Sequence, residues 1–111
     1  MNASEFAQLW RENAEQFYDM YVNESGDTAV YKLIAKLNLE PEKYALLDKL
    51  IKTILQDTHY CFLMTLDGCY NLAGVQQNYK LYDEEGQLIF QPGDLEPEAY
   101  EEIQEKLFKD V

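Results

Sequence analysis

The sequence LDKLIKTILQDTHYCFLMT, residues 47–65, organises the chain, because its apolar side chains recur at spacings of three and four. This stripe predicts one long amphipathic helix, and Pro41 suits its first position because an N–H would be unpaired there anyway. In the second half the polar arc vanishes, since Tyr60, Leu63 and Met64 occupy directions that polar side chains cover earlier. A helix that is apolar all round must be covered on every side, so this half forms either the centre of the domain or a subunit interface.

Residues His59–Leu66 also carry a competing strand pattern. They are rich in strand-favouring side chains, and Asp67-Gly68 after them is a strong signal for a two-residue hairpin turn. The helix is the favoured prediction, because the apolar stripe continues to Thr65 without a change of phase and Gly68 can end a helix in the left-handed conformation. The strand stays open as the alternative.

Two shorter helices are expected before this one. Ser4 can cap a first amphipathic helix that ends near Asn23, and Asp27 can cap a short second helix. One face of the short helix is aliphatic and consists of Val30, Leu33, Ile34 and Leu37. Its polar face carries Lys32 and Lys36.

After the long helix, the sequence predicts a β-hairpin and a closing helix. Residues 79–82 and 87–90 flank Asp83-Glu84-Glu85-Gly86, which places acids in the turn and a glycine where a positive φ is needed. The closing helix begins near Pro97 and is expected to bury three side chains, namely Tyr100, Ile103 and Leu107.

The expected fold class is therefore α+β, predominantly α, with three N-terminal helices, a small antiparallel β-hairpin and a C-terminal helix. Residues 1–111 are expected to form a single globular domain, because a chain of 111 residues is close to the commonest domain size. Its 47% hydrophobic and 14% aromatic content excludes a disordered chain.

Negative charge is the most unusual property of the sequence, which has 21 acidic and nine basic side chains and a net charge of -12. Such a chain repels phosphate backbones and anionic membranes, so neither nucleic acid nor a membrane surface is expected as a partner. Residues 81–105 hold nine acids and no base, and these are the candidate partner-binding residues: Asp83, Glu84, Glu85, Asp94, Glu96, Glu98, Glu101, Glu102 and Glu105. A basic protein partner would relieve their mutual repulsion. The alternative is that these acids only keep the protein soluble and monomeric.

Tyrosines fall near the same acidic third of the chain, at Tyr70, Tyr79, Tyr82 and Tyr100. Aromatic rings beside carboxylates make a good protein-binding surface, because the rings supply contact area and the charge steers the encounter. The alternative is that these rings belong to the core and only their hydroxyl groups reach water.

The sequence predicts no catalytic, cofactor-binding or metal-binding residue. His59 is the only histidine, and in a helix Asp57 and Cys61 point to other faces, whereas a strand would bring all three to one face. Cys61 and Cys69 lack the CxxC spacing of a metal or redox site, and reduced thiols without a secretory leader favour the cytoplasm.

The segment from Leu47 through Phe90 resembles small bacterial immunity proteins that neutralise polymorphic toxins, and related uncharacterised bacterial domains. The likeness lies in a hydrophobic helix running into Leu66-Asp67-Gly68, a short loop from Leu72 to Gly74, and then Tyr79-Lys80-Leu81-Tyr82-Asp83-Glu84-Glu85-Gly86. The resemblance implies an acidic, cytoplasmic, non-enzymatic protein that covers the basic active surface of a toxin. It transfers no functional residue to this chain.

Three functional hypotheses follow from these observations. The leading one is a non-enzymatic acidic protein-binding module, either an immunity protein or an inhibitor that docks on a basic partner. The second is a structural homodimer that uses the apolar second half of the third helix. The third is a small enzyme that uses His59 with a carboxylate, and no cofactor is expected in any of them.

Overall fold

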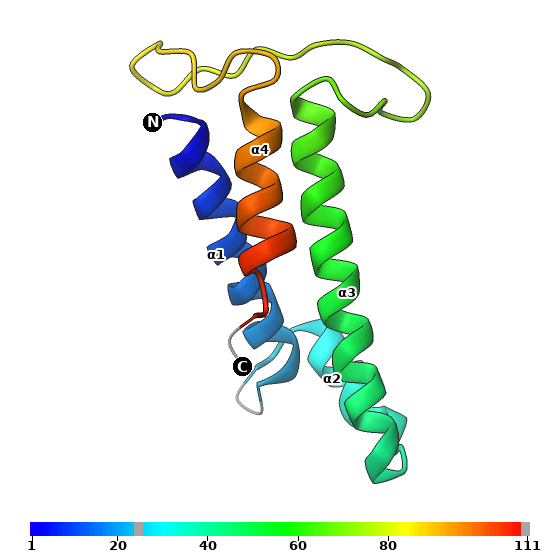
Figure 1. The fold of residues 1–111 in the computed structure, drawn as a ribbon. Coiled ribbons are helices and arrows are strands. Elements are labelled where there is room, and N and C mark those ends of the chain that lie inside the picture. The colour runs from blue at the N-terminus through cyan, green and yellow to red at the C-terminus, as the bar shows by residue number, and fades with distance from the viewer. Residues whose placement is uncertain (24–25, 110–111) are drawn as a thin grey trace.

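The computed structural model describes residues 1–23 and 26–109, and its regular elements are helices (Figure 1). The helices are α1 over Ala3–Val22, α2 over Ala29–Leu37, α3 over Pro41–Leu66 and α4 over Leu95–Ala99, which continues as the π-helix η1 over Tyr100–Lys106. Three of these helices, α1, α3 and the combined α4–η1 helix, pack side by side. The segment between α3 and α4 crosses above them, and α2 lies at the opposite end (Figure 1).

The N-cap residues of α1 and α2 lie one or two positions from the predicted caps. Asn2, not Ser4, caps α1, because its side chain accepts a hydrogen bond from the N–H of Glu5 at 2.9 Å. Thr28, not Asp27, caps α2 in the same manner. The predicted first position of α3 at Pro41 is confirmed.

The long third helix is confirmed, and it includes the ambiguous segment His59–Leu66. Gly68 then adopts a φ of 81°, and its N–H donates to the carbonyl oxygen of Thr65. A left-handed residue at this place ends the helix as expected, so the strand alternative is wrong.

The predicted β-hairpin around Gly86 is also wrong. Its turn does form, with Gly86 at a φ of 81°, but the described residues contain only isolated bridges such as Tyr82–Leu88 and no strand. The N–H of Ile89 still donates to the carbonyl oxygen of Leu81 at 2.9 Å, but the side chains of Ile89 and Phe90 are buried in the helical core and the pairing does not extend into a strand. The fold is therefore helical, and the expected α+β class is corrected.

The core lies between α1, α3 and the α4–η1 helix. Its largest fully buried side chains are Leu63, Met64, Leu95, Ile103 and Leu107. Burial of Ile103 and Leu107 was predicted and is confirmed, whereas Tyr100 is 53% exposed and its predicted burial is wrong. In the apolar second half of α3, Leu63 and Met64 belong to this core, whereas Cys61 and Phe62 are exposed, so the homodimer that uses this half of the helix stays a prediction.

A buried carboxylate fastens the start of α4. The Asp67 side chain follows α3, and its Oδ1 accepts the N–H of Gly93 at 2.8 Å while Oδ2 accepts the N–H of Glu96 at 2.9 Å. The first N–H groups of a helix have no partner within the helix, and negative charge is favourable beside them. Asp67 therefore caps α4 from a distant part of the chain and holds the two helix ends together.

Replacement of Asp67 by alanine is expected to lower the free energy of unfolding by about 1–3 kcal/mol, because two N–H groups at the start of α4 lose their carboxylate acceptor. Urea denaturation followed by circular dichroism measures the change. Asp57→Ala is the matched control, since Asp57 is exposed on α3 and its replacement is expected to change stability by less than about 0.5 kcal/mol. Equal stability of the Asp67 and Asp57 variants would contradict the capping role.

Candidate functional site

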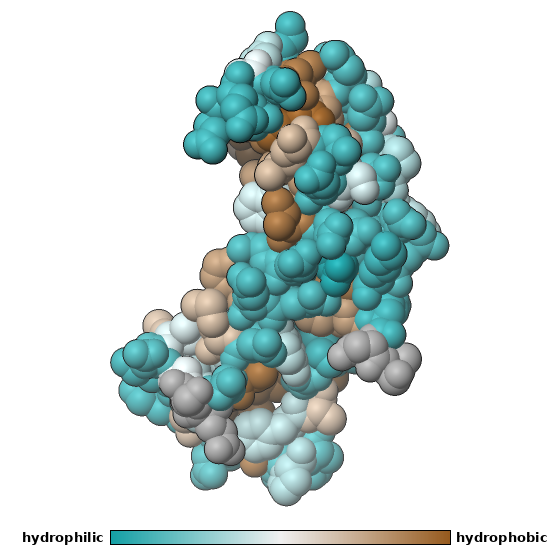
Figure 2. Space-filling view, turned by 90° about the vertical axis from the view of Figure 1, so that its left-hand side faces the viewer, coloured by the Kyte–Doolittle hydropathy of each residue, from teal (hydrophilic) through white to brown (hydrophobic). Residues whose placement is uncertain are grey.

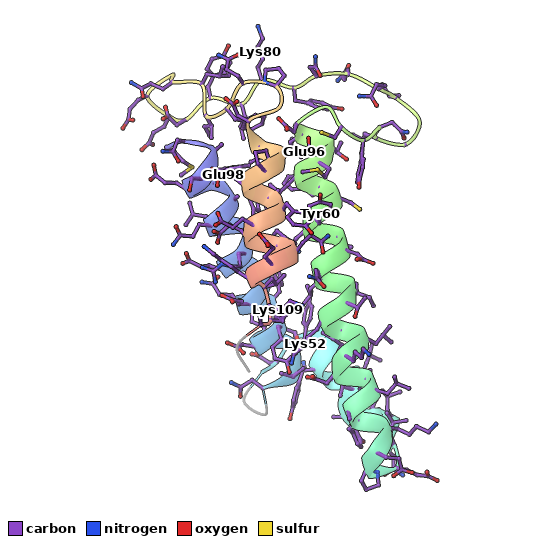
Figure 3. All side chains as sticks on the ribbon, viewed as in Figure 1. Lys52, Tyr60, Lys80, Glu96, Glu98 and Lys109 are labelled. Atoms are coloured by element: carbon purple, nitrogen blue, oxygen red, sulfur yellow. The ribbon has the colours of Figure 1, made fainter. Side chains whose placement is uncertain are left out.

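The nine predicted carboxylates fall into two groups. Asp83 and Glu102 form ion pairs within the chain, whereas the other seven make no ion pair with the described residues. The seven define what we call the acidic surface: Glu84, Glu85, Asp94, Glu96, Glu98, Glu101 and Glu105. Five of them lie at the start of α4 or along the α4–η1 helix. Glu96 lies on the side toward α3 and Glu98 on the side toward α1 (Figure 3).

Glu102 is buried between helices and is not available to a partner. Arg11 Nε donates to its Oε1 at 2.8 Å, and Lys106 Nζ donates to its Oε2 at 2.9 Å. Burial alone would raise the pKa of Glu102, but the hydrogen bonds from Arg11 and Lys106 outweigh burial and lower the pKa below its usual value of 4.5. The structure therefore removes Glu102 from the predicted partner-binding set and makes it a link between α1 and η1.

Asp83 shapes the turn that presents two other acids. Its Oδ1 accepts the N–H groups of Gln87 and Glu85, each at 3.0 Å, and these bonds lower the pKa of Asp83 although partial burial opposes them. The N-terminal amino group lies 3.6 Å from its other oxygen. Glu84 and Glu85 stay exposed at the tip of this turn.

Exposed tyrosines accompany the carboxylates. Tyr70, Tyr82 and Tyr100 are exposed, which supports the surface interpretation for these three rings, whereas Tyr79 is half-buried. Burial and the nearby Tyr70 and Glu96 groups raise the pKa of Tyr60, which lies between α3 and α4 (Figure 3). Phenol and carboxylate groups therefore converge along the α3–α4 seam.

An open hollow adjoins the acidic surface. It has a volume of about 470 Å³ and lies between the first residues of α1 and the start of α4, with Asp94 and Glu98 on one wall. Asn2 and Ser4 contribute polar side chains to the other wall. This arrangement offers a cationic side chain a recess with two carboxylates and several hydrogen-bond partners.

Most of the positive charges of the chain lie elsewhere, although Lys80 lies in the crossing segment and Lys106 in η1 itself (Figure 3). Five of the nine basic residues occur in residues 32–52, which form α2 and the first half of α3 at the end opposite the crossing segment (Figure 1). Hydrophilic residues cover most of the middle of the face in Figure 2, while hydrophobic ones appear in its upper part and along its hollowed left edge. Lysines from the first half of the chain therefore do not neutralise the acidic surface.

The surroundings of His59 do not resemble a catalytic site. Its Nδ1 lies 2.8 Å from the carbonyl oxygen of Leu55, and its Nε2 lies 3.1 Å from Asn13 Oδ1. Burial lowers its pKa, although the hydrogen bond to Leu55 opposes the shift. The adjoining pocket is lined by Trp10, Thr58, His59 and Phe62, which supply no carboxylate or nucleophilic thiol.

A second group of polar side chains has the residue types of a metal site. Ligand atoms of Asp67, Cys69 and Glu96 lie within 4.8 Å of one another. Both Asp67 oxygens already accept backbone N–H groups, and burial and nearby Glu96 raise the pKa of Cys69, which favours the thiol over the metal-binding thiolate. These groups are explained by the cap on α4 and do not favour a metal.

Replacement of Glu102 by glutamine is expected to destabilise the fold by about 2–3 kcal/mol at pH 7, because Arg11 and Lys106 lose a charged acceptor. The pKa of Glu102 is lowered in the folded chain, so its contribution is complete above about pH 4.5 and is lost as the pH falls below that value. Urea denaturation between pH 7 and pH 3 measures the difference from the wild type, which should shrink with acid. Glu105→Gln on the exposed side is the control, and a pH-independent difference would contradict the ion-pair explanation.

Comparison with known proteins assigns the chain to no family, because no protein-family model, no curated protein and no solved structure matches it. Among the described residues, no helix combines the length and apolar character needed to cross a lipid bilayer.

Proposed function

We propose that this chain is a non-enzymatic protein-binding module whose acidic surface docks on a basic protein. The observation that carries the proposal is the segregation of charge. Seven carboxylates that form no ion pair with the described residues lie in the crossing segment and along the α4–η1 helix. Five of the eight lysines lie at the opposite end, in α2 and the first half of α3.

Electrostatics explains why such a surface suits a cationic partner. Carboxylates that share a surface repel one another, and a basic partner relieves that repulsion as it docks. Complementary charge also steers the encounter and speeds association at low ionic strength. The recess beside Asp94 and Glu98 gives a lysine or arginine side chain of the partner a defined place to bind.

The exposed tyrosines give the surface affinity as well as charge. Tyr82 and Tyr100 each expose about half of their area beside carboxylates. Tyrosine is enriched among the residues that dominate binding energy, because a rigid ring buries a large area for little loss of conformational entropy. In the proposed complex these rings contact the partner and the carboxylates surround them.

An immunity protein or an inhibitor that mimics the charge of a nucleic acid fits this description. Either would act in the cytoplasm by covering the basic active surface of its target. The proposal gives no catalytic role to His59, because its hydrogen-bond partners are a backbone carbonyl and an amide.

Removal of three charges from the acidic surface is expected to weaken partner binding about tenfold or more at low salt. The test variant is Glu98→Gln, Glu101→Gln, Glu105→Gln, and the matched control is Glu40→Gln, Glu42→Gln, Asp57→Asn, which removes equal charge from α3 and the residue before it. Basic proteins are captured from a bacterial lysate on the wild type and both variants, and the dissociation constant of the best-retained protein is then titrated at several salt concentrations. Equal affinity of the two variants, or an affinity that does not change with salt, would overturn the proposal.

Replacement of Tyr100 by alanine is expected to weaken the same complex about tenfold at every salt concentration, because the lost contact is mainly apolar. Tyr44→Ala is the control, since Tyr44 is also exposed but lies near the start of α3. Titration calorimetry with the captured basic protein measures both variants. An unchanged affinity for the Tyr100 variant would exclude this ring from the interface.

A further inference from the structure

An open aliphatic groove lies between α2 and the first half of α3, far from the acidic surface. Its volume is about 250 Å³, and we call it the α2–α3 groove. Eight aliphatic side chains line it: Val30, Leu33, Ile34, Leu37, Leu47, Leu50, Ile51 and Ile54. Leu33 is 63% exposed and Leu50 is 53% exposed. This end of the molecule therefore exposes a contiguous apolar patch to water, of the kind that marks an interaction site.

Helix α2 lacks the packing that a short helix needs. It has nine residues and no buried side chain, although its aliphatic face is complete. Isolated helices shorter than about 12–15 residues are marginal in water, and in proteins most of their stability comes from burial of the apolar face. The first half of α3 also lacks buried side chains, because the first buried residue of this helix is Leu55. A further apolar surface placed over the groove would supply the missing burial.

The distribution of charge makes this end the part of the molecule that tolerates a second copy. Residues 29–54 carry five lysines and three carboxylates, a net charge of +2, so the remaining residues carry -14. Two copies that met through their acidic surfaces would repel each other strongly. The molecule is 48 Å long, so copies joined at the α2–α3 end keep their acidic surfaces apart by more than the Debye length of about 8 Å at physiological salt.

The chemistry of the groove walls favours a second copy over a foreign protein. All eight lining residues are aliphatic, so the groove offers no polar group that would select a particular partner. Homodimer interfaces are more apolar than those of transient complexes and resemble a domain core cut in half. We propose that a second copy of this chain covers the α2–α3 groove, and that α2 and the first half of α3 of both copies pack about a twofold axis.

Sedimentation equilibrium of the full chain tests this proposal over about 1–200 µM. The expected mass at high concentration is twice the 13.0 kDa of one chain. Leu33→Lys and Leu50→Lys each place a charge in the groove and are expected to raise the dimer dissociation constant at least about 100-fold. Leu72→Lys is the matched control, since Leu72 is 58% exposed in the segment between α3 and α4 and its replacement should leave the dimer intact.

Hydrogen exchange of the wild type gives a second readout that does not depend on any variant folding. The amides of residues 29–37 are expected to exchange more slowly as the concentration rises, whereas those of α1 should not change. A mass of one chain at every concentration would overturn the proposal. This holds even if the groove of the monomer binds a helix of another protein. A dimer that survives Leu33→Lys and Leu50→Lys, with α2 exchange independent of concentration, would place the contact on another surface and overturn it as well.

Discussion

The cap that Asp67 places on α4 is the contact on which the acidic surface depends. Its carboxylate binds N–H groups at the start of α4, so the end of α3 determines where the next helix begins. Lower down, the buried Glu102 joins η1 to Arg11 of α1, and Gln56 donates to the carbonyl oxygen of Ile103 at 2.9 Å. Internal acids thus hold in place the helix whose outer sides carry the exposed acids, and the two kinds of carboxylate have opposite roles.

Much of the helical fold could be predicted from apolar spacing, and the failures have identifiable causes. The turn at Gly86 was recognisable from its residues, but turn chemistry does not reveal whether the flanking residues pair with each other or pack on helices. Ile89 and Phe90 pack on the core, and that contact depends on α1, which is remote in sequence. Tyr100 was misplaced because η1 is a π-helix, in which side-chain directions differ from those of the 3.6-residue period used to predict them.

The acidic surface was predictable as a composition but not as a geometry. Glu101, Glu102 and Glu105 have the same residue type in one short segment, yet Glu102 is buried and the other two are exposed. The spacing of Glu102 and Lys106 is a visible signal for an ion pair, but the stronger partner, Arg11, lies on another helix. A sequence pattern therefore identifies the charge excess, whereas the contacts that remove one acid from the surface require the folded chain.

Segregation of charge and apolar surface gives the two ends of the molecule different dependence on solution conditions. Docking led by exposed carboxylates weakens as salt shortens the range of their field, whereas burial of aliphatic side chains such as Leu33 and Leu50 responds little to moderate salt. A dimer joined through the α2–α3 groove would present two acidic surfaces at its outer ends without bringing them near each other. In that arrangement each copy would bind its own basic partner as proposed, and a target with repeated basic sites would gain affinity from the second contact through effective concentration, without any change in either surface.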